Sequence, residues 1–168
     1  PVELKGVVMH RRILTPLLPL LFIACGIDES AATKGVEQTL DALHRFASEA
    51  DGERYFSLFT DDAVFLGTDA TERWPIAEFR EYALARFNTG VGWTYKPKKR
   101  FIYFDSDGNT AWFDEVVMNE NYGECRGTGV LEKKRGKWRI SHYNLNVPVP
   151  NDLLGRLVEI IQEYEKVE

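Results

Sequence analysis

Apolar residues recur at helical spacing in three stretches of the chain. The stripes are Val36, Leu40, Leu43 and Ala47 within about 33–50, then Ile76, Phe79, Ala83 and Phe87, and finally Leu153, Leu154, Leu157, Ile160, Ile161 and Tyr164. Such a stripe gives a helix one face to bury, so each stretch is predicted to be an amphipathic helix. Pro75 suits the first position of the second helix, and Asn151 or Asp152 would cap the third. A short helical turn is expected at 55–59.

Between these helices lie short runs of strand-forming residues bounded by turn residues. They occupy 63–67, 93–104, 110–118, 124–133 and 137–146. The last four follow one another too closely for crossover connections, so they are predicted to form an antiparallel meander. Pro97 implies a bulge or an edge position in its strand. The order of elements predicts an α+β fold, with a strongly curved antiparallel sheet wrapped around the N-terminal helix and a further C-terminal helix.

The N-terminal region carries an export pattern. His10, Arg11 and Arg12 precede an apolar run, 13–24, that ends at Cys25. A basic patch, an apolar segment and a small residue before the cut are the parts of a secretory signal. The run is also shorter than the roughly 20 residues of a membrane-spanning helix. The sequence LFIACG at 21–26 resembles a bacterial lipobox, which implies lipidation of Cys25, with a buried apolar segment as the alternative.

Composition narrows the expected partners. The formal net charge is −5, and no basic stripe suggests binding to nucleic acid. The chain has two cysteines, and acylation of Cys25 would leave Cys125 without an intrachain partner. Neither a zinc-spaced Cys/His cluster, a glycine-rich phosphate loop nor a G-x-S-x-G motif occurs in the sequence. We therefore expect no cofactor and no metal.

Several stretches resemble a known family. They are AVFLGTD (63–69) with ERW (72–74), AWFDE (111–115), CRGTGVL (125–131) and GKWRISHYNL (136–145), of which Gly-x-Trp-x-Ile-x-His is the most specific. Together they resemble SnoaL-like domains of the nuclear transport factor 2-like superfamily. The expected organisation is upstream residues and signal peptide at 1–24, a tether at 25–32, the SnoaL-like domain at 33–147 and the C-terminal helix at 148–168.

The resemblance implies a cone-shaped α+β barrel that encloses an apolar pocket and is usually a homodimer. The superfamily includes polyketide cyclases, ketosteroid isomerase, scytalone dehydratase, limonene epoxide hydrolase and many non-enzymes, so the fold does not determine the function. The catalytic patterns of those enzymes do not map residue by residue onto this chain. The resemblance therefore implies a pocket and a tendency to dimerise, and no mechanism.

The last predicted strand offers a candidate base. Trp138, Ile140, His142 and Asn144 share one face by the period-two rule, and the two apolar residues suggest that this face points inward. A neutral His142 in the interior could act as a general base. The alternative is a core histidine that is hydrogen-bonded to the backbone.

A second candidate lies at 112–115. Trp112 and Asp114 share one strand face, Phe113 and Glu115 share the other, and the sequence does not say which pair faces inward. A buried carboxylate needs a partner, and Arg126 on the next strand could supply it. The alternative is a solvated ion pair.

Two further groups have open interpretations. Asp69, Glu72, Arg73 and Trp74 could reach the mouth of the cone or only cap the following helix. The basic run at 96–100 is expected to be a solvated strand face or a protected edge. The alternating aromatic residues 93, 95, 101 and 103 could form a dimer face, a pocket wall or ordinary core packing.

We therefore expect an exported, lipid-anchored domain that binds a small, partly apolar molecule. The candidate catalytic residues are His142 and Asp114, and the candidate pocket residues are Trp74, Trp112, Glu115, Arg126 and Asn144. One alternative is a cofactor-free cyclase, isomerase, dehydratase or hydrolase. A second is a module for dimerisation or docking, whose interior would be filled by aromatic side chains.

Overall fold

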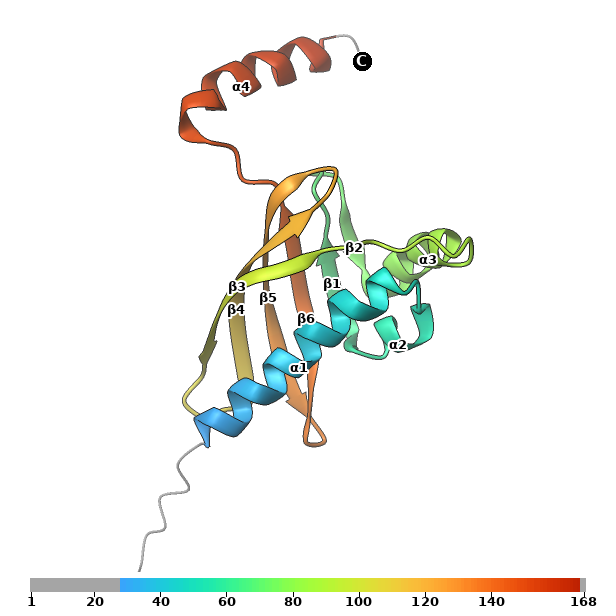
Figure 1. Cartoon of the computed structure of the whole chain (residues 1–168), viewed down its shortest axis with the longest axis vertical. Helices are drawn as coiled ribbons and strands as arrows, with labels where there is room; N and C mark the ends of the chain where they lie inside the picture. Colours follow the sequence, from blue (N-terminus) through green and yellow to red (C-terminus); the bar gives the residue numbers. More distant parts are fainter. Residues whose placement is uncertain (1–27, 167–168) are drawn as a thin grey trace, which may run out of the picture.

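The computed structural model describes residues 28–166, beginning at the cap of a long helix (Figure 1). Helix α1 (Glu29–Ser48) is capped by the Asp28 side chain, which accepts a hydrogen bond from the Ala31 N–H. The predicted stripe is buried, with Val36 and Leu40 fully enclosed. Residues 29–32 are thus helical, and their expected role as a tether is wrong: the polar stretch supplies a first helical turn. The expected signal sequence and Cys25 lie outside the described residues.

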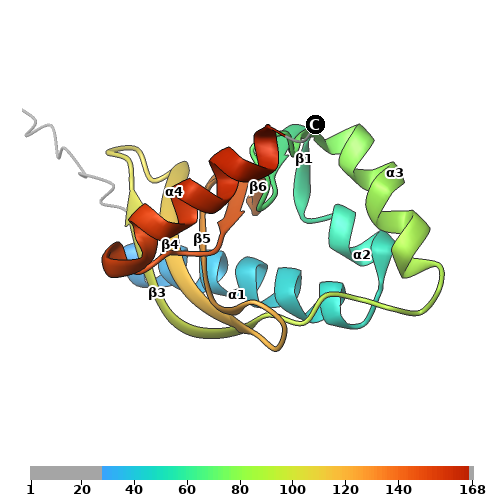
Figure 2. The same cartoon turned by 90° about the horizontal axis from the view of Figure 1, so that it is seen from above.

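Two shorter helices follow at one end of α1. Helix α2 (Gly52–Phe56) begins and ends earlier than the helical turn expected at 55–59. Phe59, which was expected to be helical, is the first residue of a strand. Helix α3 (Ile76–Phe87) has the predicted buried face of Phe79, Ala83 and Phe87, and Pro75 is its N-terminal cap. Figure 2 shows α1, α2 and α3 grouped around the hollow of the sheet.

Within the described residues the strands form one six-stranded sheet in the order β2-β1-β6-β5-β4-β3. The strands are β1 (Phe59–Leu66), β2 (Arg73–Pro75), β3 (Lys96–Phe104), β4 (Thr110–Asn119), β5 (Gly123–Lys134) and β6 (Lys137–Asn146). The antiparallel meander from β3 to β6 is confirmed. The sheet is curved but unclosed, and β1 pairs with β6 in parallel. The α+β fold class is confirmed.

Two bulges change which face of a strand points inward. The pairing of β3 with β4 shifts between Pro97 and Lys99, so the bulge predicted from Pro97 is confirmed on an edge strand. In β6, Ile140 pairs with Leu131 and His142 pairs with Val130, so Ser141 is an extra residue. One extra residue inverts the alternation of side chains beyond it. Both inversions affect the candidate site.

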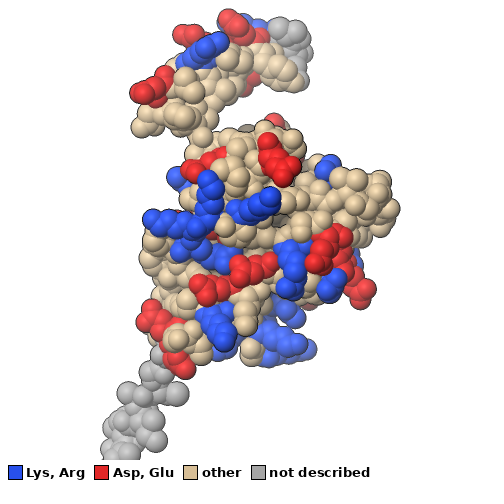
Figure 3. Space-filling model, in the orientation of Figure 1, with Lys and Arg blue, Asp and Glu red and all other residues tan. Residues whose placement is uncertain are grey.

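Helix α4 (Asn151–Glu165) stands apart from the body of the domain (Figure 1). None of its residues is buried, and its apolar stripe, which includes Leu153 and Ile160, is exposed. Figure 3 shows acidic and basic side chains interspersed over the visible face of the domain and over this helix. Across residues 28–166 the helices lack the combination of length and hydropathy needed to span a membrane.

Candidate functional site

A cavity of about 160 Å³ opens between α1, α3 and the inner face of the sheet. Among the described residues, nine aromatic side chains line it: Tyr55, Phe65, Trp74, Phe79, Tyr82, Trp93, Tyr95, Tyr122 and Tyr143. Leu43, Ala47 and Leu145 add aliphatic surface, while His44, Thr68 and Glu72 add polar groups. A mostly apolar cavity with a few polar groups is the usual form of a small-molecule site.

The cavity has a closed end and an open end. Tyr55, Phe79 and Tyr143 are each 3% exposed and form part of its deep wall. Tyr82 and Tyr122 are more than half exposed, and they stand where the cavity meets solvent. The rings are organised by stacking, since Phe65 lies parallel to Phe79 with centroids 3.9 Å apart. A ligand entering past the tyrosines would meet ring surface on several sides.

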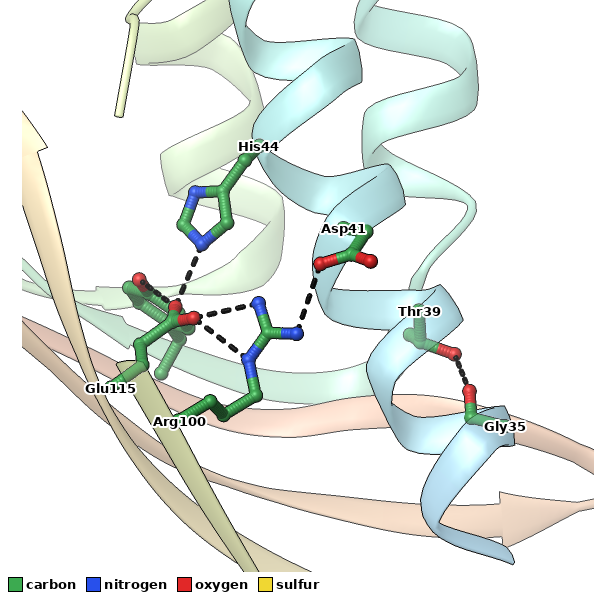
Figure 4. Close-up of polar contacts among 7 residues, drawn as sticks. Gly35, Thr39, Asp41, His44, Arg100 and Glu115 are labelled. Atoms are coloured by element: carbon green, nitrogen blue, oxygen red, sulfur yellow. Dashed lines mark hydrogen bonds and ion pairs between the residues drawn. The ribbon is translucent and has the colours of Figure 1, made fainter. Parts of the chain in front are cut away.

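A buried carboxylate lies behind this cavity (Figure 4). The side chain of Glu115, on β4, has no exposed surface. His44 on α1 places Nε2 2.7 Å from Glu115 Oε1. The Tyr143 hydroxyl donates to the same oxygen at 3.1 Å. Arg100 on β3 donates to Oε2 through Nε at 2.9 Å and through Nη2 at 2.7 Å. The carboxylate therefore joins the helix to two strands.

The pairing keeps Glu115 ionised. Burial by itself raises the pKa of Glu115, but the hydrogen bond and charge of His44 and the Arg100 guanidinium outweigh burial and hold that pKa below its ordinary value. The Arg100 guanidinium has a second acidic partner, since its Nη1 donates a hydrogen bond to Asp41 Oδ1 at 2.9 Å. Burial and the neighbouring carboxylate raise the pKa of Tyr143 well above its ordinary value, so its hydroxyl keeps its proton.

His44 connects this cluster to the cavity. Its imidazole is a lining group, and its Nε2 is fixed by Glu115. An ionised carboxylate only accepts hydrogen bonds, so Nε2 carries the hydrogen in this contact. An imidazole oriented in this way can take part in proton transfer to a bound molecule. The Tyr143 hydroxyl lies on the same carboxylate oxygen, which places a second proton-bearing group at the cavity wall.

Of the predicted pocket residues, Trp74 lines the cavity and Glu115 lies directly behind it. Glu115 rather than Asp114 faces inward, which settles the alternative that the sequence left open. The predicted pairing with Arg126 is wrong, because Arg126 pairs with Val116 in the β4–β5 ladder and its side chain is exposed on the outer face. Arg100 is the partner instead, and it belongs to the basic run that was expected to be solvated.

His142 and Asn144 lie on the outer face, so their expected interior position is wrong. The extra residue Ser141 inverts the alternation, and Tyr143 and Leu145 are buried in their place. Trp112 and Asp114 also belong to the outer face, where Trp112 is 45% exposed and stacks on Tyr103 with ring centroids 6.0 Å apart. The catalytic role of His142 and Asp114 stays a prediction, for a surface outside the cavity.

Sequence reasoning missed His44, Arg100 and Tyr143, although each had a signal. His44 follows Leu40 by four positions and therefore falls on the buried stripe of α1. Arg100 shares the phase of Ile102 and Phe104 in β3, which are less exposed than Phe101 and Tyr103. In β6 the apolar residues change phase after Ile140, and this change reveals the bulge.

Solved structures resemble this fold. An NTF2-like protein of unknown function from Pseudomonas putida KT2440 superposes with a TM-score of 0.61 at 12% identity, over 76% of this chain and 93% of that one. A proposed scytalone dehydratase from Novosphingobium aromaticivorans gives 0.61 at 14% identity, over 72% and 87%. An NTF2-like protein from Cytophaga hutchinsonii gives 0.57 at 14% identity, over 69% and 98%. At these identities the likeness shows the fold alone.

Comparison with curated proteins gave no match. The sequence does match the family described as SnoaL-like domain, over residues 36–150. That span contains α1 from Val36 onward, α2, α3 and the whole six-stranded sheet, and hence the cavity and the Glu115 cluster. This chain belongs to the SnoaL-like domain family.

Proposed function

We propose that the domain binds a small, largely apolar molecule in the aromatic cavity. The observation that carries the proposal is the cavity itself, because the aromatic residues surround it instead of filling it. Its volume of about 160 Å³ is near the roughly 150 Å³ of an apolar protein cavity that holds benzene. It is smaller than the 300–1,000 Å³, approximately, of sites for drug-sized ligands. A molecule of about one ring is the best match.

Native mass spectrometry of the full chain, purified gently from its host, tests this proposal. We expect a co-purifying small mass on the wild type. Tyr82→Ala should weaken its retention, because Tyr82 lines the open end and is 51% exposed, so its loss costs little stability. Tyr164→Ala is the matched control, since this tyrosine on α4 is 65% exposed and lies outside the cavity. An empty wild type that also fails to retain added one-ring compounds would contradict the proposal.

A second candidate function is cofactor-free proton-transfer catalysis, and the His44–Glu115 contact favours it. The base would be Nδ1 of His44, whose Nε2–H is held by Glu115. Isomerisation, dehydration and cyclisation all require such a transfer. The proposed scytalone dehydratase with a similar fold is compatible with this class.

Exchange of α-protons in cyclohexanone dissolved in D₂O, followed by NMR, reports a general base without knowledge of the natural substrate. His44→Gln should abolish enzyme-dependent exchange, while His142→Gln should leave it unchanged because His142 lies on the outer face. Loss of exchange in His142→Gln but not in His44→Gln would instead favour His142 as the general base, as predicted from the sequence. If the wild type has no exchange activity, ligand binding without catalysis is the better description.

We further propose that the protein is exported and anchored through Cys25, on the strength of the basic and apolar pattern that ends at this residue. Metabolic labelling with a fatty acid tests this directly. Cys25→Ser should lose the label and leave the membrane fraction. Cys125→Ser should keep the label, because Cys125 is buried in β5. Labelling of the Cys25 variant would contradict the proposal.

Homodimerisation is also proposed, through the outer face of the sheet. Phe101, Tyr103 and Trp112 are each more than 40% exposed there and form an aromatic patch. Exposed apolar patches of this kind commonly mark protein contacts. Sedimentation of the wild type should give a dimer, and Trp112→Glu should give a monomer with an unchanged far-UV spectrum. A wild-type monomer at high concentration would contradict this proposal.

A further inference from the structure

The charge of the cavity wall restricts its ligand. Among the described residues that line the cavity, Glu72 is the one carboxylate, and neither lysine nor arginine is present. Glu72 Oε2 accepts a hydrogen bond from the Asp69 N–H at 3.2 Å. Within residues 28–166 no basic side chain lies within ion-pairing distance of Glu72. Glu115, by contrast, is already neutralised by Arg100 and is hydrogen-bonded to His44.

Glu72 lies next to the most aromatic part of the wall. The β1–β2 connection that carries it leads directly into Trp74, whose ring stacks on Tyr82 with centroids 5.3 Å apart. Tyr82 in turn stacks on Trp93 at 6.3 Å. Burial raises the pKa of Tyr95 to about 12. Cys125, Tyr122 and, least of all, Glu72 add to this rise. Glu72 therefore lies beside a group of stacked aromatic side chains.

Aromatic faces attract cations because the ring quadrupole is negative above and below the plane. The chain already uses one of these rings in this way, since the Arg86 guanidinium lies 5.7 Å from the centroid of Trp93. Arg86 itself is not among the lining residues, although its charge reaches Tyr95 and opposes the rise in the pKa of that tyrosine. Aromatic side chains recognise alkylated ammonium groups through their faces, and a nearby carboxylate adds charge attraction.

On the basis of the proposed small-molecule function, we propose that the cavity selects a small organic cation. Its alkylated ammonium group is held among Trp74, Tyr82 and Trp93, and Glu72 is its counter-charge. The methyl groups of such a cation retain the apolar contact that the cavity offers. Its positive charge supplies the ion-pair partner that Glu72 lacks. A small anion of equal size would meet repulsion from Glu72 and no compensating base.

Two probe molecules of the same shape, one charged and one neutral, test whether the cavity selects for positive charge. Choline and 3,3-dimethylbutan-1-ol have the same outline, but only choline carries a charge, and both are close to benzene in heavy-atom count. We expect tryptophan fluorescence titrations of the full chain, at constant ionic strength, to give at least a tenfold lower Kd for choline. Glu72→Gln should reduce that ratio to about twofold or less, because glutamine keeps an acceptor for the Asp69 N–H but removes the charge. Glu37→Gln, an exposed change on α1 outside the cavity, should leave the ratio unchanged.

Equal binding of the two probes, or a choline preference that survives Glu72→Gln, would overturn the inference. Either result would leave the small-molecule function intact, because the alcohol would still report an apolar site. Absence of binding by both probes would also overturn the inference. In that case a ligand mass in the native spectrum decides separately whether the proposed binding function stands.

Discussion

Removing the guanidinium that neutralises Glu115 is expected to destabilise the fold strongly. In Arg100→Met the aliphatic stem is retained, but Glu115 loses two charge-assisted hydrogen bonds, of 2.7 and 2.9 Å, at a side chain with no exposed surface. Breaking a buried pair from one side costs about 3–5 kcal/mol, since the remaining charge stays desolvated. A domain of this size has about 5–15 kcal/mol of total stability, so the variant should be close to unfolding.

Urea unfolding of the full chain, followed by tryptophan fluorescence and circular dichroism, measures this loss. Lys98→Met is the matched control on the same strand: Lys98 pairs with Glu124 at 3.9 Å, and both side chains are more than half exposed. An exposed pair contributes about 0–1 kcal/mol, so this variant should be nearly neutral. The double variant Arg100→Met/Glu115→Met should recover much of the loss, because it removes both buried charges. Equal stabilities for the two single variants would refute the reasoning.

Three further outcomes follow from the same geometry. The pKa of Glu115 in the folded protein lies below its ordinary value of 4.5. The ionised carboxylate therefore stabilises the fold fully above pH 4.5, and this stabilisation is lost as the pH falls through the pKa of the folded state. The free energy of unfolding should therefore decrease on acidification, and less steeply in Glu115→Gln; identical pH profiles would contradict this. Gly127→Ala should cost roughly 1–3 kcal/mol, because the added Cβ would lie 2.5 Å from the Tyr143 hydroxyl, whereas Gly155→Ala, with open space around it, should be neutral or stabilising in chemical denaturation. Removing residues 151–168 should change the free energy of unfolding by less than about 1 kcal/mol, since no residue of α4 is buried; a larger loss would show that the helix packs on the domain in solution.

The helices and the meander were accessible from the sequence because each has a local signal. The stripe of α1, the face of α3 and the closely spaced turns between β3 and β6 need only neighbouring residues. The parallel pairing of β1 with β6 has no such signal, because it joins segments separated by most of the domain. The start of α1 was also missed, since Asp28 and Glu29 precede the apolar stripe and act through capping.

The site was predicted less well because its residues depend on the phase of the strands. Strict alternation from Ile140 points His142 inward, but one extra residue at Ser141 replaces it with Tyr143. At 96–100, the composition indicates a solvated strand, yet the register turns Arg100 towards Glu115. Period-two reasoning holds only between bulges, and the sequence reveals a bulge mainly through a change in the phase of its apolar residues.

The position of β6 has a consequence for synthesis. This strand is the last of the sheet in chain order, yet it lies between β1 and β5 and supplies Ile140, Tyr143 and Leu145 to the core. While the ribosome has made only the preceding residues, β1 and β2 have no partner that connects them to the meander. Late closure by a long-range parallel pair favours folding only after β6 has been made, and it prolongs the period during which the growing chain is unfolded.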